Sequence, residues 1–360
     1  MATYLRTWRI LVALLPMLGS IALAHATLVG AQQDDPTARD AQSRIVATNS
    51  ERFSFALWGD MPYGTNGDED QVSALIDDMN RSDIAFSIFD GDTKDGSSWC
   101  TDEVIGAEAR AFFDRLQAPV VYVLGDNEWT DCHRLNNGGY DNLERLDFLR
   151  RTMFGTPTSF GQRQLMLEHQ GPMGGSYSEN TRWTFGQVVF VGLNVPGSNN
   201  NKVTEDDCFI ASARTQEQCD ADNAEYLERD GKNIEWMRGS FALARQQGAL
   251  GIMLVIQADP SFDVPETAAN ERARPGMDGY DAFLAALEDE TRAFAGQVVL
   301  VHGDTHIFKI DKPLLHERRV IENFTRVGTF GSPHIHWLRV WVNPESRGVF
   351  TFEPMTVVGN

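Results

Sequence analysis

The sequence predicts an α/β fold in which two packed sheets are flanked by helices. Strand-like and helix-like segments alternate along most of the 360 residues, a pattern typical of α/β folds. Four of the strand-like segments run through apolar residues into a Gly-Asp step, and these steps end at Asp60, Asp92, Asp126 and Asp304. No internal repeat or linker breaks the pattern, so we expect one folded domain.

The first half of the chain contains three strand-like segments, each followed by a helix-like one. The strands are expected at Phe53–Trp58, Ile84–Phe89 and Val120–Leu124, and the helices at Asp70–Asn80, Ala107–Leu116 and Asp141–Arg151. In the second helix, Phe112, Phe113 and Leu116 share one face, which indicates the side that packs on the core.

The second half begins with two sequential strands and then returns to alternation. The expected elements are strands at Ser176–Thr184 and Gln187–Leu193, an irregular loop at Pro196–Asn201, a helix at Asn223–Gln246, a strand at Gly251–Ile256, a helix at Tyr280–Phe294 and a strand at Gln297–Val301. The tail from Ile307 to Phe352 carries several further β-like runs.

The first residues have the pattern of a secretory signal peptide. Arg6 and Arg9 precede an apolar run from Ile10 to Leu23, and small residues follow. A membrane anchor is the alternative, but the run is short for a span and contains Pro16 and Gly19. We expect a signal peptide at 1–31, a disordered lead at 32–51 and the folded domain at 52–360. The protein would then be secreted or periplasmic, with no membrane span after cleavage.

The charge and the cysteines limit the partners and the compartment. A formal net charge of −20 argues against binding to nucleic-acid backbones or anionic membranes. A small phosphorylated substrate remains compatible, because bound cations would reverse the local charge. Four cysteines in an exported chain indicate two disulfides. Of the three possible disulfide connectivities we favour Cys100–Cys132 and Cys208–Cys219. No feature of the sequence identifies a protein partner.

The four Gly-Asp steps together indicate a metal site. One such step is a common turn, because Gly tolerates positive φ and Asp bonds to nearby backbone N–H groups. Four of them at strand ends collect carboxylates at one edge of a sheet, where open α/β sheets place their sites. Clustered carboxylates repel one another unless a cation neutralises them.

These motifs resemble those of the calcineurin-like metallophosphoesterases. The matching segments run from Phe53 to about Trp341, and they are Asp60-Met-Pro62, Gly91-Asp-Thr-Lys-Asp95, Gly125-Asp-Asn-Glu128, Val255-Ile-Gln257 and Gly303-Asp-Thr-His306. The second motif matches the family pattern fully, and the others are altered. The resemblance implies the two-sheet sandwich flanked by helices (αββα) of that family.

Carried over position by position, the resemblance implies a set of metal ligands. Asp60 would bind a first metal and Asp92 would bridge two metals, while Asp126 stands in place of an Asn and Gln257 in place of a His. Asp304 replaces the first His of the last motif, and His306 retains the second. The His of the first motif is Pro62 here, for which Tyr63 could compensate. Because oxygen donors suit hard cations, two ions of Mn²⁺, Mg²⁺ or Ca²⁺ are favoured over iron and zinc.

The resemblance further implies hydrolysis of phosphate mono- or diesters by metal-activated water. Asn127 occupies the position of a family His and can donate a hydrogen bond, but it cannot act as a general acid. We therefore expect His302 to supply the proton, with His133 as the second candidate. The alternative function is an inactive protein of the same fold that binds a cation or a phosphorylated ligand. Lys94 could meet a phosphate, although an exposed lysine is the commoner outcome.

Overall fold

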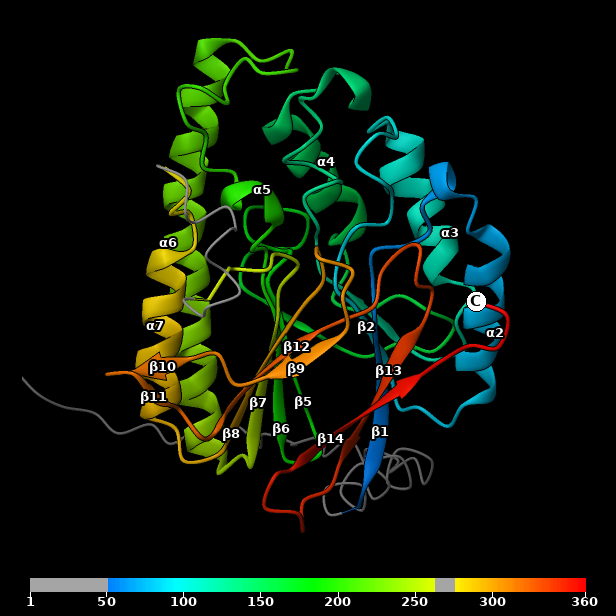
Figure 1. Cartoon of the computed structure of the whole chain (residues 1–360), viewed down its shortest axis with the longest axis vertical. Helices are drawn as coiled ribbons and strands as arrows, with labels where there is room; N and C mark the ends of the chain where they lie inside the picture. Colours follow the sequence, from blue (N-terminus) through cyan, green and yellow to red (C-terminus); the bar gives the residue numbers. More distant parts are fainter. Residues whose placement is uncertain (1–50, 263–275) are drawn as a thin grey trace, which may run out of the picture. The chain divides into compact units, whose positions relative to one another are not determined.

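The computed structural model describes residues 51–262 and 276–360, which fold around two large sheets (Figure 1). The first sheet has the strand order β14 (Phe350–Met355), β13 (Trp337–Val342), β1 (Phe53–Trp58), β2 (Ser87–Phe89) and β3 (Val120–Tyr122). The second sheet has the order β4 (Glu168–His169), β5 (Thr181–Phe185), β6 (Val188–Gly192), β7 (Gly251–Val255), β8 (Gln297–His302), β12 (Phe324–Gly328) and β9 (Lys309–Asp311). A separate short pair joins β10 (Leu315–His316) to β11 (Arg319–Val320).

The central strands of both sheets are parallel and the outer ones are antiparallel. In the first sheet β1, β2 and β3 run in parallel, with Leu57 opposite Ile88 and Ile88 opposite Val121. In the second sheet β6, β7, β8 and β12 run in parallel. Parallel strands need crossover connections, which the chain supplies mostly as helices. The carboxyl ends of the parallel strands therefore lie together at one edge of each sheet.

Helices cover the outer face of each sheet, so the predicted αββα sandwich is confirmed (Figure 1). The helices are α2 (Glu69–Arg81), α3 (Ala109–Phe113), α4 (Asn142–Met153), α5 (Gly197–Asn200), α6 (Gln216–Gln247) and α7 (Asp281–Arg292), with short helical turns η2 (Gly64–Asn66), η3 (Glu103–Glu108) and η4 (Leu135–Asn137). Side chains of α2, α3 and α4 pack on the first sheet, and side chains of α6 and α7 pack on the second.

Because side chains alternate between the two faces of each strand, the two sheets and their helices enclose three apolar layers. In β1, Phe55 and Leu57 point between the sheets, whereas Ala56 and Trp58 point to the helices, because successive side chains leave opposite faces of a strand. The layer between the sheets also holds Phe190 and Val301. Strands buried on both faces explain the nearly continuous apolar runs that precede the Gly-Asp steps.

Local signals move three boundaries from their expected places. Helix α6 begins at Gln216, seven residues before the expected start, because Thr215 and Gln218 form a capping box there. The strand expected from Ser176 begins only at Thr181, and the expected loop from Pro196 contains the short α5. The acidic insertion thus contributes the first turns of the longest helix.

Both expected disulfides are present. Cys100 is bonded to Cys132 across 32 residues, and Cys208 to Cys219 across 11. The first bridge joins the loops that follow β2 and β3, so it ties together the segments that carry Asp92 and Asp126. The favoured connectivity is therefore confirmed.

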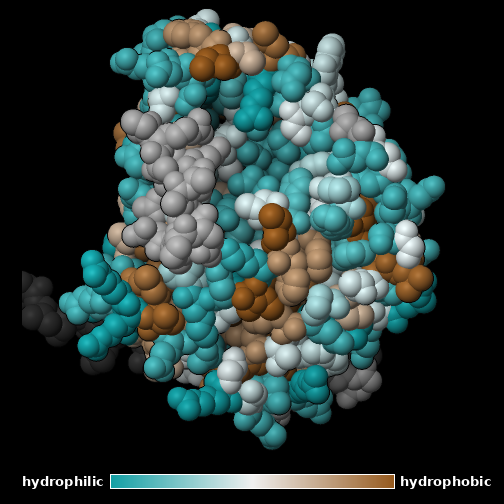
Figure 2. Space-filling model, viewed as in Figure 1, coloured by the Kyte–Doolittle hydropathy of each residue, from teal (hydrophilic) through white to brown (hydrophobic). Residues whose placement is uncertain are grey.

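The expected signal peptide and almost all of the expected lead lie outside the described residues. Within residues 51–262 and 276–360, no helix is long and apolar enough to cross a membrane. The face in Figure 2 is largely hydrophilic, and its hydrophobic side chains are scattered in small patches, as the acidic composition leads us to expect.

We expect the longer disulfide loop to contribute more to stability. Replacing Cys100 and Cys132 together by alanine should lower the free energy of unfolding by about 3–4 kcal/mol, because the bridge restricts the unfolded chain. Replacing Cys208 and Cys219 should cost about 1 kcal/mol less, because their loop is shorter. Urea unfolding of both pairs measures the difference, and the reverse order would contradict this account.

Candidate functional site

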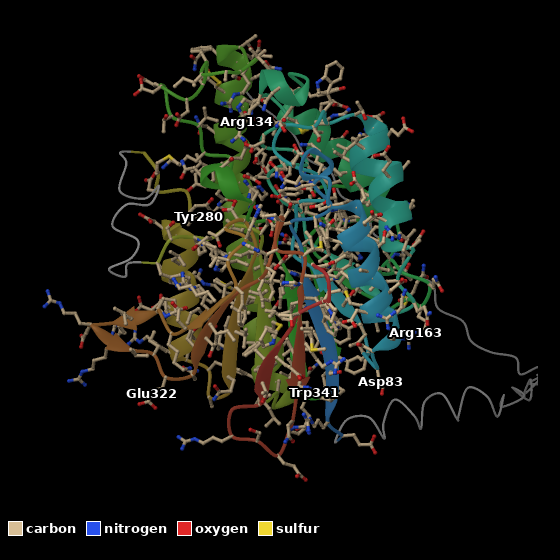
Figure 3. The ribbon with its side chains drawn as sticks, turned by 45° about the vertical axis from the view of Figure 1, so that its right-hand side comes forward. Asp83, Arg134, Arg163, Tyr280, Glu322 and Trp341 are labelled. Atoms are coloured by element: carbon tan, nitrogen blue, oxygen red, sulfur yellow. A yellow bond between two sulfur atoms is a disulfide. The ribbon has the colours of Figure 1, made fainter. Side chains whose placement is uncertain are left out.

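The predicted site residues lie at the carboxyl ends of parallel strands from both sheets. Asp60, Asp92 and Asp126 follow β1, β2 and β3, while Gln257 and Asp304 follow β7 and β8. Figure 3 places Arg134 toward this end of the fold and Asp83 and Trp341 toward the opposite end. The two sheets thus deliver side chains from five strands to one region.

Four of the predicted ligands have left-handed backbone conformations. The φ angles are 51° at Asp60, 63° at Asp92, 66° at Asp304 and 59° at His306. Such angles are uncommon outside glycine, and residues that adopt them concentrate at functional sites where the surrounding structure holds them. The surrounding structure therefore holds these four residues in uncommon conformations at or near the strand ends.

Two motif glycines allow the close approach of the turns. A Cβ atom on Gly125 would lie 2.0 Å from Oδ1 of Asp92, and one on Gly91 would lie 2.5 Å from Cγ of Gln257. Gly91 also has a φ of 116°, which a residue with a side chain rarely adopts. A larger residue at Gly125 would displace Asp92, and one at Gly91 would displace Gln257.

Hydrogen-bond donors surround the carboxylate of Asp92. Asn127 donates its backbone N–H to Oδ1 (3.1 Å) and its side-chain amide to Oδ2 (2.9 Å). The hydroxyl of Tyr63 lies 3.3 Å from the same Oδ2. Tyr63 therefore reaches the cluster as the sequence suggested, and Asn127 uses its amide to hold Asp92.

The side-chain amide of Gln257 is hydrogen-bonded to both Asp92 and Asp126. Its nitrogen Nε2 lies 3.2 Å from Oδ2 of Asp92 and 3.1 Å from Oδ1 of Asp126. Its oxygen Oε1 accepts the backbone N–H of Gly197 at 2.5 Å. The oxygen expected to bind a metal thus faces away from the carboxylates, and Gln257 acts as a donor in this arrangement.

His306 is oriented as metal-binding imidazoles are. Its Nδ1 lies 2.6 Å from the backbone oxygen of Ser332, and its Nε2 lies 3.3 Å from Oδ1 of Asp60. A carbonyl partner on one ring nitrogen fixes the ring and directs the other nitrogen at its partner. Burial alone would lower the pKa of His306, but the hydrogen bond and charge of Asp60 raise it overall. His306 and Asp60 therefore lie in direct contact, with the imidazole partly exposed and the carboxylate fully buried.

Negative charge is concentrated around this pair. The buried carboxylates in this region include Asp60, Asp90, Asp92, Asp95, Asp126, Glu128 and Asp131. Burial is the main cause that raises the pKa of Asp60, Asp92 and Glu128, and Asp126 raises that of Asp92 further. Lys94 is buried rather than exposed and bonds to the backbone of Asp95, and burial lowers its pKa.

The histidine expected to supply a proton is enclosed in the protein. His302 is 1% exposed, its Nδ1 lies 2.9 Å from the backbone oxygen of Gly303, and its Nε2 has no hydrogen-bond partner. Burial lowers its pKa, so the imidazole is neutral at pH 7. A neutral, enclosed imidazole is poorly placed to protonate a leaving group, which weighs against the role expected for His302.

The loop after β6 forms a single left-handed turn beside the carboxylates. Ser198, Asn199, Asn200 and Asn201 have φ angles of 50°, 56°, 58° and 61°. The fully buried Arg229 holds the turn by donating to Oδ1 of Asn200 at 2.6 Å and to its backbone oxygen at 2.8 Å. The asparagines of this turn are buried and bonded to protein groups, so they build the turn instead of presenting amides to a ligand.

Ser198 connects the carboxylates to Asp131, which the sequence analysis did not single out. Its hydroxyl lies 3.0 Å from Oδ2 of Asp126 and 2.7 Å from Oδ1 of Asp131. Arg134 approaches Oδ2 of Asp131 at 2.6 Å. Burial, followed by the charge of Asp126, raises the pKa of Asp131 to about 7. The sequence signal for Asp131 was only its place between the third motif and Cys132.

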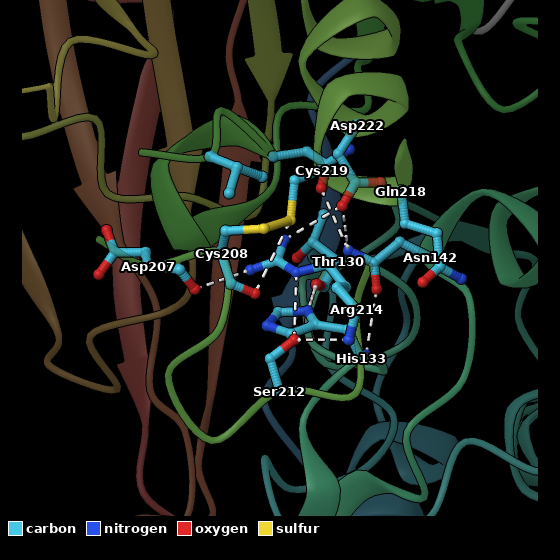
Figure 4. A network of polar contacts seen from close by, with 12 residues as sticks. Thr130, His133, Asn142, Asp207, Cys208, Ser212, Arg214, Gln218, Cys219 and Asp222 are labelled. Carbon is cyan, nitrogen blue, oxygen red and sulfur yellow. Dashed lines mark hydrogen bonds and ion pairs between the residues drawn. A yellow bond between two sulfur atoms is a disulfide. The ribbon is translucent and has the colours of Figure 1, made fainter. Parts of the chain in front are cut away.

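A cavity of about 290 Å³ opens next to Ser198. Its wall includes Asp131, His133, Arg134, Ser198, Lys202, Asp207, Ile210 and Arg214. Figure 4 shows how Arg214 is held there, by Asp222 at 3.1 Å and by the backbone oxygen of Asp207 at 3.1 Å. Burial and the charge of Arg214 lower the pKa of His133 to about 4. The cavity thus offers a neutral imidazole and three cationic side chains beside the acidic cluster.

The cluster is not a preformed cage for a metal ion. Among the residues that the structure describes, no three His, Cys, Asp or Glu side chains are grouped so that they could hold one ion. Hydrogen bonds and the contact of Asp60 with His306 satisfy many of the acidic oxygens instead. Binding a cation would require some of these side chains to exchange partners.

Known proteins resemble this chain in backbone structure and not in sequence. No protein-family model and no curated protein sequence matches the chain. GAP50, the anchor in the inner membrane complex of Plasmodium, is 12% identical with a TM-score of 0.43, over 85% of this chain and 89% of GAP50. A 5'-nucleotidase from Candida albicans is 11% identical with a TM-score of 0.42, over 84% of this chain and 50% of the nucleotidase. The chain thus spans about half the length of the nucleotidase.

We expect Asp131 to make the protein less stable as the pH rises. The raised pKa of Asp131, about 7, means that the folded state binds its proton more tightly than the unfolded state. This contribution is present below the unfolded pKa near 4 and is lost as the pH rises through 7. In chelator, urea unfolding should show the wild type losing stability relative to Asp131→Asn between pH 4 and 7. A pH-independent difference would contradict the prediction.

Proposed function

We propose that this chain is an exported, metal-dependent phosphoesterase related to the calcineurin-like metallophosphoesterases. The observation that carries the proposal is the set of left-handed turns, which places Asp60, Asp92, Asp304 and His306 at the ends of strands from both sheets. These residues come from three of the motifs by which the sequence resembles the family. The two disulfides and the signal-like N-terminal sequence support export.

The residues around Asp60 are of the types that ligate a divalent cation, and they would have to exchange hydrogen-bond partners to surround one ion. Asp60 and Asp92 supply carboxylates, and His306 supplies an imidazole whose Nδ1 is fixed by the Ser332 carbonyl. The surplus of buried carboxylates around them is the charge environment that a cation neutralises. A mainly oxygen-donor set favours Mn²⁺, Mg²⁺ or Ca²⁺. A cation bound there would polarise a phosphoryl oxygen and lower the pKa of a water molecule.

The neighbouring cavity is the place we assign to the alcohol part of the ester. Arg134 and Lys202 bring cationic side chains to its wall, and Ser198 links it to Asp126. Its volume of about 290 Å³ suits a small leaving group rather than a polymer. The substrate class is therefore a small phosphate mono- or diester.

Asp131 is the group best placed to deliver a proton to that leaving group. It lines the cavity, it bonds to Ser198, and its pKa of about 7 keeps part of it protonated at neutral pH. A general acid works best when its pKa lies near the working pH. Asp131 is as buried as His302, but only Asp131 lies in the wall of the cavity, so this assignment replaces the role expected for His302.

A binding protein without turnover is the second candidate. The observation that favours it is that Asp92 already accepts hydrogen bonds from Asn127 and Gln257. In addition, no three acidic or imidazole side chains among the described residues surround one point. Such a protein would bind a cation or a phosphorylated ligand without hydrolysing it.

Hydrolysis of bis-p-nitrophenyl phosphate with Mn²⁺ separates the two candidates. We expect turnover in the wild type and a loss of about 10²-fold or more in Asp92→Asn, because metal-assisted attack depends on this carboxylate. Circular dichroism should show an unchanged fold. Asp77→Asn, on the exposed side of α2, is the matched control and should keep full activity. Saturable Mn²⁺ binding without turnover in the wild type would favour the binding protein.

The role of Asp131 is tested by the nature of the leaving group. Asp131→Asn should slow hydrolysis of an alkyl phosphate by about 10²–10⁴-fold and should affect a p-nitrophenyl ester far less, because a good leaving group needs little protonation. In the wild type, alkyl ester hydrolysis should fall as the pH rises above 7. An equal loss on both esters would show that Asp131 acts only on the structure.

A further inference from the structure

The segment between Cys208 and Ser212 exposes apolar side chains beside the cavity. Phe209 is 57% exposed and Ile210 is 65% exposed, although both are large hydrophobic residues in a chain with a formal net charge of −20. Figure 2 shows hydrophobic side chains gathered at the end of the molecule where α6 begins. Ile210 and Ala211 also belong to the wall of the cavity. This exposed apolar surface is therefore continuous with the cavity, and such surfaces commonly bind ligands or partners.

Contacts on both sides hold this segment in place. The Cys208–Cys219 disulfide ties its start to α6 (Figure 4). At its other end the backbone oxygen of Ala211 accepts the N–H of Leu135 at 2.9 Å, and Ala211 has the left-handed φ of 50°, which is uncommon outside glycine. A surface that is already ordered loses little conformational entropy when a ligand binds. The segment is therefore preorganised to present its apolar side chains.

The wall of the same cavity also presents cationic groups. The side chain of Arg134 is 38% exposed. Among the described residues it pairs with Asp131 at 2.6 Å and donates to Ser198 at 3.2 Å, which engages only part of the five N–H donors of a guanidinium. Lys202 pairs with Asp278, and because both side chains are partly exposed this pair can open at little cost. Arg134 and Lys202 therefore have donors for the oxygens of a phosphoryl group.

The cationic and the apolar parts of the wall lie at different depths. Ser198 bonds to Asp126 at 3.0 Å and accepts from Arg134, so the guanidinium lies near the inner end of the cavity, beside the acidic cluster. Ile210 is largely exposed and lies where the cavity meets solvent. A ligand that matches both parts has a phosphoryl group at its inner end and an apolar group at its outer end. Release of water from that apolar group and from Ile210 would favour binding.

We propose that the cavity and the apolar segment bind a small organic phosphate whose alcohol part is apolar. The phosphoryl group would lie against Arg134 and Ser198, and an alkyl or aryl group would cover Ile210 and Phe209. This inference rests on the proposed function, because it names the class of alcohol in the ester. A cavity of about 290 Å³ that is continuous with the apolar surface favours a small molecule over a protein or a membrane.

Binding of alkylphosphonates, which contain no ester bond to hydrolyse, tests the inference without using activity. Calorimetric titration of the disulfide-intact full chain in chelator compares methyl-, butyl- and hexylphosphonate. The affinity of the wild type should rise with chain length, by up to about fourfold for each methylene group that the protein buries. In the double variant Phe209→Ser, Ile210→Ser the gain from methyl to hexyl should largely disappear, whereas Arg134→Gln should weaken all three ligands alike.

Val320→Ser is the matched control for the double variant. It removes a half-exposed apolar side chain from β11, outside the cavity wall, and should bind the three phosphonates as the wild type does. Circular dichroism of each variant should show an unchanged fold. An equal loss of hexylphosphonate affinity in Val320→Ser would show that the effect is not specific to the segment.

The outcomes separate this inference from the proposed function. Equal affinity for the three chain lengths, or no binding of any of them to the folded wild type, would overturn the inference, while turnover of bis-p-nitrophenyl phosphate would still support the phosphoesterase. Chain-length dependence without turnover of any phosphate ester would support the apolar ligand class and overturn the phosphoesterase, leaving the ligand-binding protein.

Other occupants of the apolar segment would give different results. Co-sedimentation of the wild type with vesicles of phosphatidylcholine and phosphatidic acid would assign the segment to a membrane if the double variant abolished it. A dimer in sedimentation velocity that the double variant dissociates would assign the segment to a second copy of the chain. We expect neither result, and either one would overturn the assignment to a small phosphate ester.

Discussion

The repulsion among buried carboxylates is the constraint around which the site is organised. Several of them follow the parallel strands of the first sheet, and burial raises the pKa of Asp60, Asp90, Asp92, Glu128 and Asp131. Water screens such a group less here, because the side chains are buried. Each neighbouring polar group is accordingly a donor: the amides of Asn127 and Gln257, the hydroxyls of Tyr63 and Ser198, and the imidazole of His306.

The backbone conformation also helps to bring the carboxylates and their hydrogen-bond donors together. Left-handed residues at the strand ends aim the side chains inward, and the left-handed turn from Ser198 to Asn201 brings Gly197 and Ser198 against Gln257 and Asp126. Each left-handed residue other than glycine costs about 1 kcal/mol or more, and that cost persists only where the surroundings impose it. For the turn from Ser198 to Asn201 these surroundings include the buried Arg229, which donates to the side chain and the backbone oxygen of Asn200.

The fold could be read from the sequence because its signals are local. Continuous apolar runs before each Gly-Asp step identify strands buried on both faces, and the four acidic residues follow directly from those runs. Cysteine positions relative to the turns were enough to select the disulfides. The start of α6 was misplaced because the capping box at Thr215 lies within a polar stretch that resembles a loop.

The details of the site could not be read in the same way, because they depend on orientation and burial. Whether Gln257 presents oxygen or nitrogen is decided by Gly197, which is 60 residues away in the sequence. His302 and His306 stand four positions apart on one strand and its following turn, yet one is enclosed and the other reaches Asp60. Asp131 could not be singled out from the sequence, because its burial and its place on the cavity wall depend on the fold.

The Cys208–Cys219 bridge fixes a loop that shapes the cavity but takes no part in the packing of the sheets. It ties the loop that carries Ile210 and Ala211 to the first turns of α6, and both residues line the cavity while the apolar core lies elsewhere. Changes at these two positions remodel the cavity wall without opening a void between the sheets. The cavity wall can therefore differ in this loop while the scaffold that holds the carboxylates stays the same.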